Sequence, residues 1–197
     1  MTDGAKWNQR YASGDLPWDT GKPSTELQRV VAQQRIAPCR ALDLGCGTGS
    51  NTIWLAQKGF EAMGIDIAPL AVTQACQRAR AAGVSAQFQV ADILHPPNFD
   101  QPFQFFFDRG CYHAVRRADP TAYAPAIVRL LAPGAVGLIL AGNACESHDD
   151  GPPVVSEEQL RSELGATFRI VELREFRFDS PPKSSESFLA WSCLVTR

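Results

Sequence analysis

Short apolar runs alternate along this chain with longer segments whose apolar positions recur at helical spacing. The apolar runs predict buried or half-buried strands, and they cover residues 41–44, 61–67, 86–93, 103–107 and 135–141. The segments with helical spacing predict helices, and they cover residues 25–36, 51–58, 69–82 and 120–131. Strands and helices that alternate in this way indicate an α/β fold with a parallel sheet.

The C-terminal third has a different pattern. Residues 143–155 form a polar stretch that predicts a loop, and Ser156 is placed to cap a following helix. Residues 168–178 and 188–196 read as two further strands with no helical pattern between them. We expect these two strands to pair antiparallel at one edge of the sheet.

A glycine-rich turn directly follows the first predicted strand. Its glycines are Gly45, Gly47 and Gly49, preceded by Asp43 and followed by Ser50. Glycine lets the backbone take unusual conformations and lets a ligand approach closely, and a helix that starts here adds free N–H groups. The dinucleotide fingerprint G-x-G-x-x-G needs a third glycine where Ser50 stands, so the spacing speaks against a nucleotide-dependent oxidoreductase.

Acidic residues stand at the ends of the next strands. Asp66 ends the second strand about 20 residues after the glycines, where a carboxylate accepts hydrogen bonds from two ribose hydroxyls; the alternative is a cap of the following helix. Asp92 ends the third strand, where its carboxylate and the N–H of Ile93 can recognise an adenine edge. The carboxyl ends of parallel strands meet at one edge of a sheet, so these residues predict one ligand crevice.

The fourth strand ends in a cluster of functional groups. Asp108 is followed by Arg109, whose guanidinium suits a carboxylate or an anionic substrate. His113 is a candidate base, and its alternative is a buried helix residue with a satisfied ring. Cys111 is better explained as a pocket-lining residue than as a nucleophile, because no base with an orienting partner is visible beside it.

The segment before the first predicted helix is polar and rich in turn residues, yet it carries Trp7, Tyr11 and Trp18. These rings could anchor an arm on the core, because large aromatic side chains bury much area. They could also cover a cationic ligand, since a cation over an aromatic face gains ~0.5–2 kcal/mol. Both roles are compatible.

Composition narrows the class of protein. The chain has 197 residues and a formal net charge of −2, so we expect one domain and neither a nucleic-acid nor a membrane partner. The first residues lack the apolar segment of a signal peptide. Six scattered cysteines without metal-ligand spacing predict free thiols, no metal site and a cytoplasmic location. The oligomeric state stays open.

The chain resembles class I S-adenosylmethionine (SAM) methyltransferases over essentially its whole length, and within them the thiopurine S-methyltransferase and halide/thiol methyltransferase group. The motifs that carry the resemblance are W-x3-Y-x6-W followed by D-T-G-K-P-S, then D-L-G-C-G-T-G, G-I-D, A-D-I, F-D-R-G and a late G-P-P. The resemblance implies a Rossmann-like, seven-stranded, mostly parallel sheet with helices on both faces and an antiparallel edge strand. It implies one domain over residues 1–197, with residues 1–25 as a lid arm.

The resemblance also implies roles for individual residues, with SAM as cofactor and S-adenosylhomocysteine as product. Arg109 matches an arginine that lies near cofactor and substrate in thiopurine S-methyltransferases, where the halide enzymes typically carry an aromatic residue. We therefore expect Arg109 and His113 as catalytic residues. The expected cofactor-binding residues are Trp7, Tyr11, Trp18, Asp43, Gly45, Gly47, Asp66, Ile67, Asp92, Ile93 and Asp108.

The function expected from these motifs is S-methylation of a small thiol by in-line displacement. A thiolate is soft and already anionic, so it needs orientation and desolvation more than a strong base. Two alternatives stay open: methylation of a halide or of a metalloid anion such as tellurite, and a non-catalytic role in SAM binding.

Overall fold

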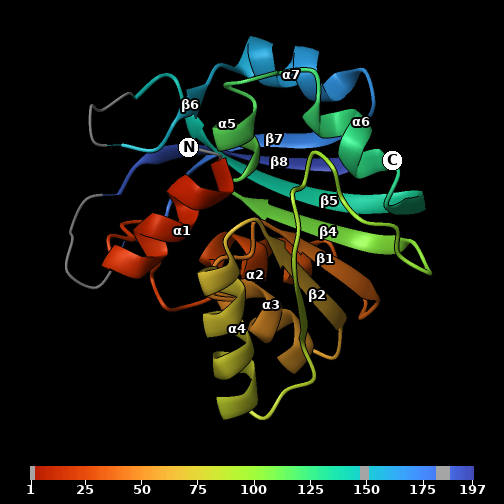
Figure 1. Cartoon of the computed structure of the whole chain (residues 1–197). Helices are drawn as coiled ribbons and strands as arrows, with labels where there is room; N and C mark the ends of the chain where they lie inside the picture. The colour runs from red at the N-terminus through yellow and green to blue at the C-terminus, as the bar shows by residue number, and fades with distance from the viewer. Residues whose placement is uncertain (1–2, 147–150, 181–186) are drawn as a thin grey trace.

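One sheet runs through the middle of the protein, and helices cover both of its faces (Figure 1). The computed structural model describes residues 3–146, 151–180 and 187–197. The strands are β1 (Arg40–Leu44), β2 (Glu61–Asp66), β3 (Gln87–Val90), β4 (Phe103–Arg109), β5 (Leu131–Asn143), β6 (Val154–Val155), β7 (Arg169–Arg177) and β8 (Leu189–Thr196). The helices are α1 (Asp3–Ser13), α2 (Thr25–Gln33), α3 (Ser50–Gln57), α4 (Pro69–Ala81), α5 (Tyr112–Val115), α6 (Tyr123–Val128) and α7 (Glu157–Gly165).

The strand order confirms the predicted α/β fold. It is β3-β2-β1-β4-β5-β8-β7; the strands from β3 to β5 pair parallel, and β8 pairs antiparallel with both of its neighbours. Within the described residues the sheet has eight strands rather than seven. The additional strand, β6, lies in the segment expected as a loop, where Val154 and Val155 pair with the end of β5. Residues 147–150 of that expected loop lie outside the described part.

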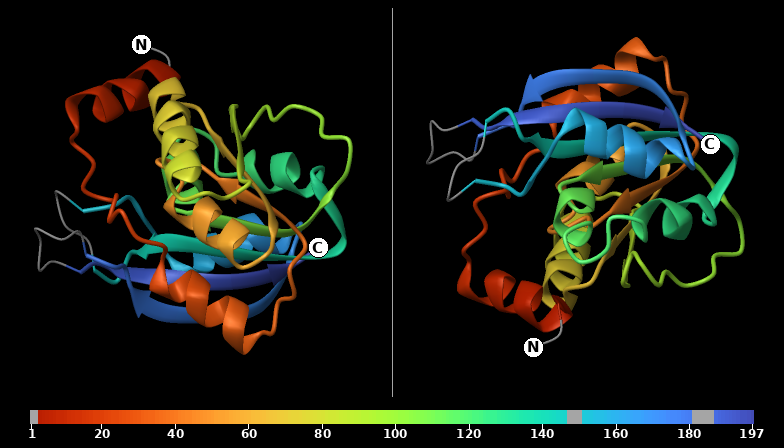
Figure 2. Two further views of the ribbon diagram at one scale, coloured as in Figure 1. Left: turned by 90° about the horizontal axis from the view of Figure 1, so that it is seen from below. Right: turned by 90° about the horizontal axis from the view of Figure 1, so that it is seen from above.

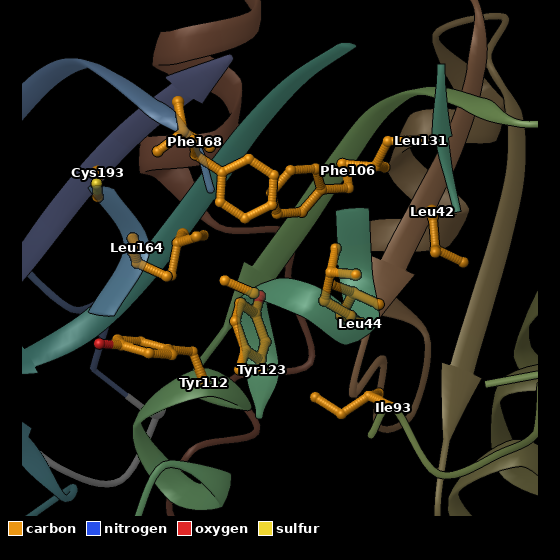
Figure 3. Close-up of a cluster of buried hydrophobic side chains, with 14 of the residues drawn as sticks. Leu42, Leu44, Ile93, Phe106, Tyr112, Tyr123, Leu131, Leu164, Phe168 and Cys193 are labelled. Carbon is orange, nitrogen blue, oxygen red and sulfur yellow. The ribbon is translucent and has the colours of Figure 1, made fainter. Parts of the chain in front are cut away.

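Each face of the sheet buries its own apolar layer. One layer packs under α5, α6 and α7, and Figure 3 shows in it Phe106 facing Phe168 and Tyr112 beside Tyr123. The other layer joins α2 and α3 to the opposite face of the central strands. Apolar layers on both faces explain why Phe105, Phe106 and Phe107 follow one another in β4 and are all buried. A Cβ on Gly137, which pairs with Phe106 across β4 and β5, would lie 2.0 Å from that ring.

Local signals mark the starts of three helices. Ser24 caps α2 by accepting a hydrogen bond from the N–H of Leu27 at 3.5 Å, Pro69 stands in the first turn of α4, and Ser156 and Gln159 form a reciprocal capping box on α7. These features agree with the sequence-based boundaries. Of the described residues, none form a helix with the length and apolarity that crossing a bilayer requires.

Several elements differ from the expectation, including α2, which ends at Gln33 rather than at residue 36. The arm contains helix α1, because Trp7 and Tyr11, one turn apart, pack on α4. The helix expected over 120–131 covers only Tyr123–Val128, because Leu131 is buried and pairs with Phe103, so β5 begins there. The strand expected over 86–93 ends at residue 90, which leaves Asp92 in the loop beyond it.

Candidate functional site

The glycine loop connects β1 to α3 at the carboxyl edge of the sheet. Gly45, Gly47 and Gly49 have φ values of +64°, +55° and +83°, a region that other residues rarely adopt. Space is limiting as well, since a Cβ on Gly45 would lie 2.8 Å from the Cβ and Sγ of Cys111. The loop backbone is therefore close to the turn that follows β4.

Asp66 fixes this loop from the end of β2. Its Oδ2 accepts the N–H of Gly47 at 2.9 Å, and its Oδ1 accepts the N–H of Ala68 at 2.8 Å. Burial raises the pKa of Asp66, and the backbone donors oppose that shift. The two oxygens of Asp66 thus hold the glycine loop and the start of α4 together.

Asp43 and Asp108 are buried near the ends of β1 and β4. Asp43 accepts a hydrogen bond from the hydroxyl of Thr52 at 2.6 Å, and Asp108 accepts from the N–H of Cys111 at 2.9 Å and the hydroxyl of Tyr123 at 2.8 Å. Burial raises the pKa of each carboxyl to about 7. Asp108 therefore organises the turn after β4 from inside the core.

Asp92 and Ile93 follow β3 at the same edge of the sheet. The N–H of Ala91 donates to the carbonyl of Asp66 at 2.9 Å, which continues the β2–β3 pairing towards Asp92. Asp92 accepts the N–H of Leu94 at 2.9 Å, whereas Ile93 is buried in the apolar layer. The second carboxylate oxygen of Asp92 lies 2.9 Å from Nδ1 of His95.

The N-terminal arm carries its aromatic rings to α4 and to the glycine loop. Trp18 meets Trp7 and Tyr11 edge to face, with ring centroids 5.4 and 6.3 Å apart. The three rings pack with Leu70 of α4, and Figure 2 shows α1 crossing one end of α4. The hydroxyl of Tyr11 would lie 3.0 Å from a Cβ on Gly47. Burial, together with the nearby carboxylate of Asp66, raises the pKa of Tyr11.

Arg109 ends β4 and joins the arm to the C-terminal part of the chain. Its Nη1 donates to the carbonyl of Trp18 at 2.9 Å, and its guanidinium carbon lies 5.1 Å from the ring centroid of Phe178. Burial lowers the pKa of Arg109, and the carboxylates of Asp179 and Asp19 oppose that shift. An arginine side chain nevertheless stays charged, so Arg109 brings a fixed cation to the site.

His113 lies in α5 with its ring buried. Its Nδ1 accepts the N–H of Gly142 at 2.9 Å, and its ring meets Phe178 edge to face with centroids 6.4 Å apart. Burial and the positive charge of Arg109 lower its pKa to about 3. The ring is therefore neutral at physiological pH, and its Nδ1 lone pair is already used.

One cavity is lined by six of the predicted site residues. Its lining contains Tyr11, Trp18, Asp43, Gly45, Gly47 and Arg109. Seven other predicted residues do not line this cavity: Trp7, Asp66, Ile67, Asp92, Ile93, Asp108 and His113. The cavity thus joins the arm, the glycine loop and the end of β4.

The lining also contains residues that the sequence reasoning did not single out: Asp19, Thr20, Lys22, Cys46, Thr48, Ser50 and Asn51. Thr48, Ser50 and Asn51 belong to the glycine loop or the start of α3, so their position in the motif could have identified them. Asp19 follows Trp18, and only the path of the arm shows that its carboxylate reaches Thr48.

The lining fits a ligand with polar groups beside the glycine loop. The Ser50 hydroxyl oxygen is buried and has no hydrogen-bond partner among the described residues. Such a group is costly unless a ligand or water satisfies it. It stands at the start of α3, beside glycines that leave room for close approach, so these residues fit the amino-acid part of SAM.

Comparison with known proteins identifies the family. The family model described as thiopurine S-methyltransferase (TPMT) matches residues 2–191. The 2-heptyl-1-hydroxyquinolin-4(1H)-one methyltransferase of Mycobacteroides abscessus is 34% identical over 148 residues, which cover 74% of this chain and 65% of that protein. The thiopurine S-methyltransferase of Pseudomonas fluorescens is 26% identical over 180 residues, which cover 83% of this chain and 81% of that protein.

A solved structure agrees with this assignment. A protein studied for the conversion of a disulfide bond into a thioacetal group during echinomycin biosynthesis superposes with a TM-score of 0.87 and 26% identity, covering 100% of this chain and 92% of its own. This chain belongs to the thiopurine S-methyltransferase family of SAM-dependent methyltransferases, and SAM is its cofactor.

Proposed function

We propose that this protein methylates the sulfur of a small thiol. The observation that carries the proposal is Arg109, a largely buried cation that lines the same cavity as the glycine loop. A buried guanidinium favours an anion, and a thiolate is an anion that reacts without further proton removal. The family description and the sulfur chemistry of the similar solved structure support this choice.

The residues of the crevice divide the work of binding. When bound, SAM supplies an electrophilic methyl group for in-line displacement by the acceptor. Gly45 and Gly47 leave room for its methionine part, Asp66 with Ile67 accepts the ribose hydroxyls, and Asp92 with Ile93 recognises the adenine. These assignments rest on the position of each residue at the carboxyl edge of the sheet.

The remaining predicted residues shape the crevice. Residues 1–25 act as a lid arm of one domain; Trp7, Tyr11 and Trp18 carry it across the glycine loop and exclude water. Asp43 and Asp108 hold the loops beneath the crevice. Arg109 orients the acceptor anion. Residues 1–2 of the arm lie outside the described part.

His113 is better placed to position the backbone than to accept a substrate proton. Its Nδ1 holds the N–H of Gly142, at the end of β5, and its pKa of about 3 makes it a weak base. We therefore assign it a positioning role. The cytoplasm is the location that we infer, because all six cysteines are free thiols.

A second candidate function is methylation of an acidic hydroxyl on an N-hydroxy heteroaromatic ring. The relative from Mycobacteroides abscessus, named for a hydroxyquinolone substrate, favours this candidate. Such a substrate ionises to an anion, which Arg109 could orient as it would a thiolate. The two candidates share a site and differ in the reacting atom.

An acceptor panel separates these candidates. Purified protein with SAM is offered hydrosulfide, alkyl and aryl thiols, a thiopurine, a 1-hydroxyquinolin-4-one, a phenol, iodide and tellurite, and S-adenosylhomocysteine release is measured. We expect turnover to be fastest with thiols. Turnover only with the hydroxyquinolone, iodide or tellurite would contradict the thiol proposal. Silence with all acceptors, despite bound S-adenosylhomocysteine, would contradict the thiol proposal and leave a SAM-binding protein whose acceptor lies outside those that the family uses.

Arg109→Ala tests the role of the guanidinium. If Arg109 favours the thiolate, its loss lowers kcat/KM most below the acceptor's thiol pKa, by about 10-fold or more. Rates are compared over a pH series, with Arg117→Ala as the control because Arg117 is an exposed arginine nearby. Unaltered activity, or the same loss at every pH, would reject this role.

His113→Asn tests the positioning role, because the amide oxygen can still accept from Gly142. The folded-state pKa of about 3 lies below the ordinary 6.5, so the unfolded chain takes up a proton first as the pH falls. This group therefore makes the free energy of unfolding fall between pH 6.5 and 3, by about 1.4 kcal/mol from pH 7.5 to 5.5. Urea unfolding should show a shallower loss in the variant, with kcat retained. The positioning role would be contradicted if the free energy of unfolding had the same pH dependence in both proteins, or if the folded variant lost kcat.

A further inference from the structure

The arm is held over the glycine loop from two sides. On one side, Arg109 binds the carbonyl of Trp18 at 2.9 Å. On the other side, Arg78 of α4 donates through Nη2 to the carbonyl of Gly21 at 3.0 Å. The four arm residues from Trp18 to Gly21 are thus fixed at both ends by arginines that come from different elements.

Arg78 also binds the glycine loop itself. Its Nη1 donates to the carbonyl of Thr48 at 3.2 Å and also contacts the Thr48 hydroxyl. One planar guanidinium therefore reaches the arm and the loop together, which suits its fixed fork of donors. Arg78 is partly buried and does not belong to the described lining of the cavity.

The carboxylate of Asp19 completes a closed ring of hydrogen bonds. Its Oδ2 accepts from the hydroxyl of Thr48 at 2.8 Å, and its Oδ1 accepts from the N–H of Gly21 at 2.9 Å. The ring runs from Arg78 to Thr48, to Asp19, to Gly21 and back to Arg78. Opposite charges on Arg78 and Asp19 strengthen bonds of this kind.

We propose that Arg78 is a positioning residue that latches the N-terminal arm closed over the cofactor crevice. The inference rests on the proposed lid function of the arm. Arg78 acts through Gly21 and Thr48 and touches neither the acceptor nor the reacting atoms. Because one side chain holds both the arm and the loop, closure of the arm and the shape of the glycine loop change together.

The latch has a measurable effect on cofactor affinity. A ligand that binds only the closed form has an apparent Kd equal to its intrinsic Kd divided by the closed fraction. Removing the bonds from Arg78 lowers that fraction. Bonds to a charged donor contribute enough for a loss of about 10-fold or more in S-adenosylhomocysteine affinity.

The test compares Arg78→Gln with Arg80→Gln. Arg80 lies in the same last turn of α4 and is exposed, so both variants remove one positive charge from the helix end. Hydrogen–deuterium exchange is followed in the free protein on an arm peptide over residues 19–24 and on a control peptide over residues 189–196. The arm amides of Gly21 and Ser24 are reporters because both are hydrogen-bonded.

We expect faster exchange of the arm peptide in Arg78→Gln alone, with the β8 peptide unchanged. Calorimetric titration should show S-adenosylhomocysteine affinity lowered about 10-fold or more by Arg78→Gln and unchanged by Arg80→Gln. Unchanged arm exchange in Arg78→Gln would overturn the latch, even if affinity fell. Equal effects of the two variants would overturn it as well, by assigning them to the charge of the helix end.

A second variant keeps the test decisive if Arg78→Gln fails to fold. Arg78→Lys keeps the charge and the apolar stem but cannot span Gly21 and Thr48 with a planar fork. We expect faster arm exchange in this variant too, and wild-type exchange would overturn the proposal. The exchange measurement needs neither cofactor nor acceptor. The exchange measurement therefore tests the latch even if the protein does not carry out the proposed methyl transfer.

Discussion

The Asp66 carboxylate is the interaction on which the rest of the site depends. It stands at the end of β2 and accepts the N–H of Gly47 on one oxygen and that of Ala68 on the other. The glycine loop and the start of α4 are thereby held by a single buried group. A buried carboxylate that accepts two backbone hydrogen bonds has little conformational freedom. The glycine loop therefore keeps its shape before any cofactor binds.

Two layers of apolar side chains make this arrangement rigid. Apolar side chains pack on both faces of the central strands. The acids lie at the carboxyl ends of these strands, where hydrogen bonds stabilise the buried carboxylates. Asp43 accepts from the hydroxyl of Thr52 in α3, and Asp66 and Asp108 accept from backbone N–H groups of the segments that follow their strands. The arm then covers the edge with aromatic rings and is fixed by Arg109 and Arg78. The residues that stabilise this edge of the sheet are thus also the residues that shape the crevice.

The strands and the crevice could be predicted from the sequence because their signals are local. The glycine spacing, the acids after strands and the cap at Ser156 each act within a few residues. The helix α1 and the early start of β5 could not be predicted in this way, since Trp7 packs against residues at the start of α4 and Leu131 pairs with Phe103. The same limit applies to Asp19 and Arg78, which meet at Thr48 only in the folded chain. The satisfied ring of His113 depends on Gly142 in the same way.

The most direct measurement of this account is a calorimetric titration of S-adenosylhomocysteine into the wild type and Asp66→Asn. Asparagine has one acceptor oxygen and an amide nitrogen, so either Gly47 or Ala68 loses its partner. We expect tight binding by the wild type and an affinity lowered about 10-fold or more in the variant, with the exposed Asp100→Asn as control. Equal affinities for Asp66→Asn and the wild type would contradict it.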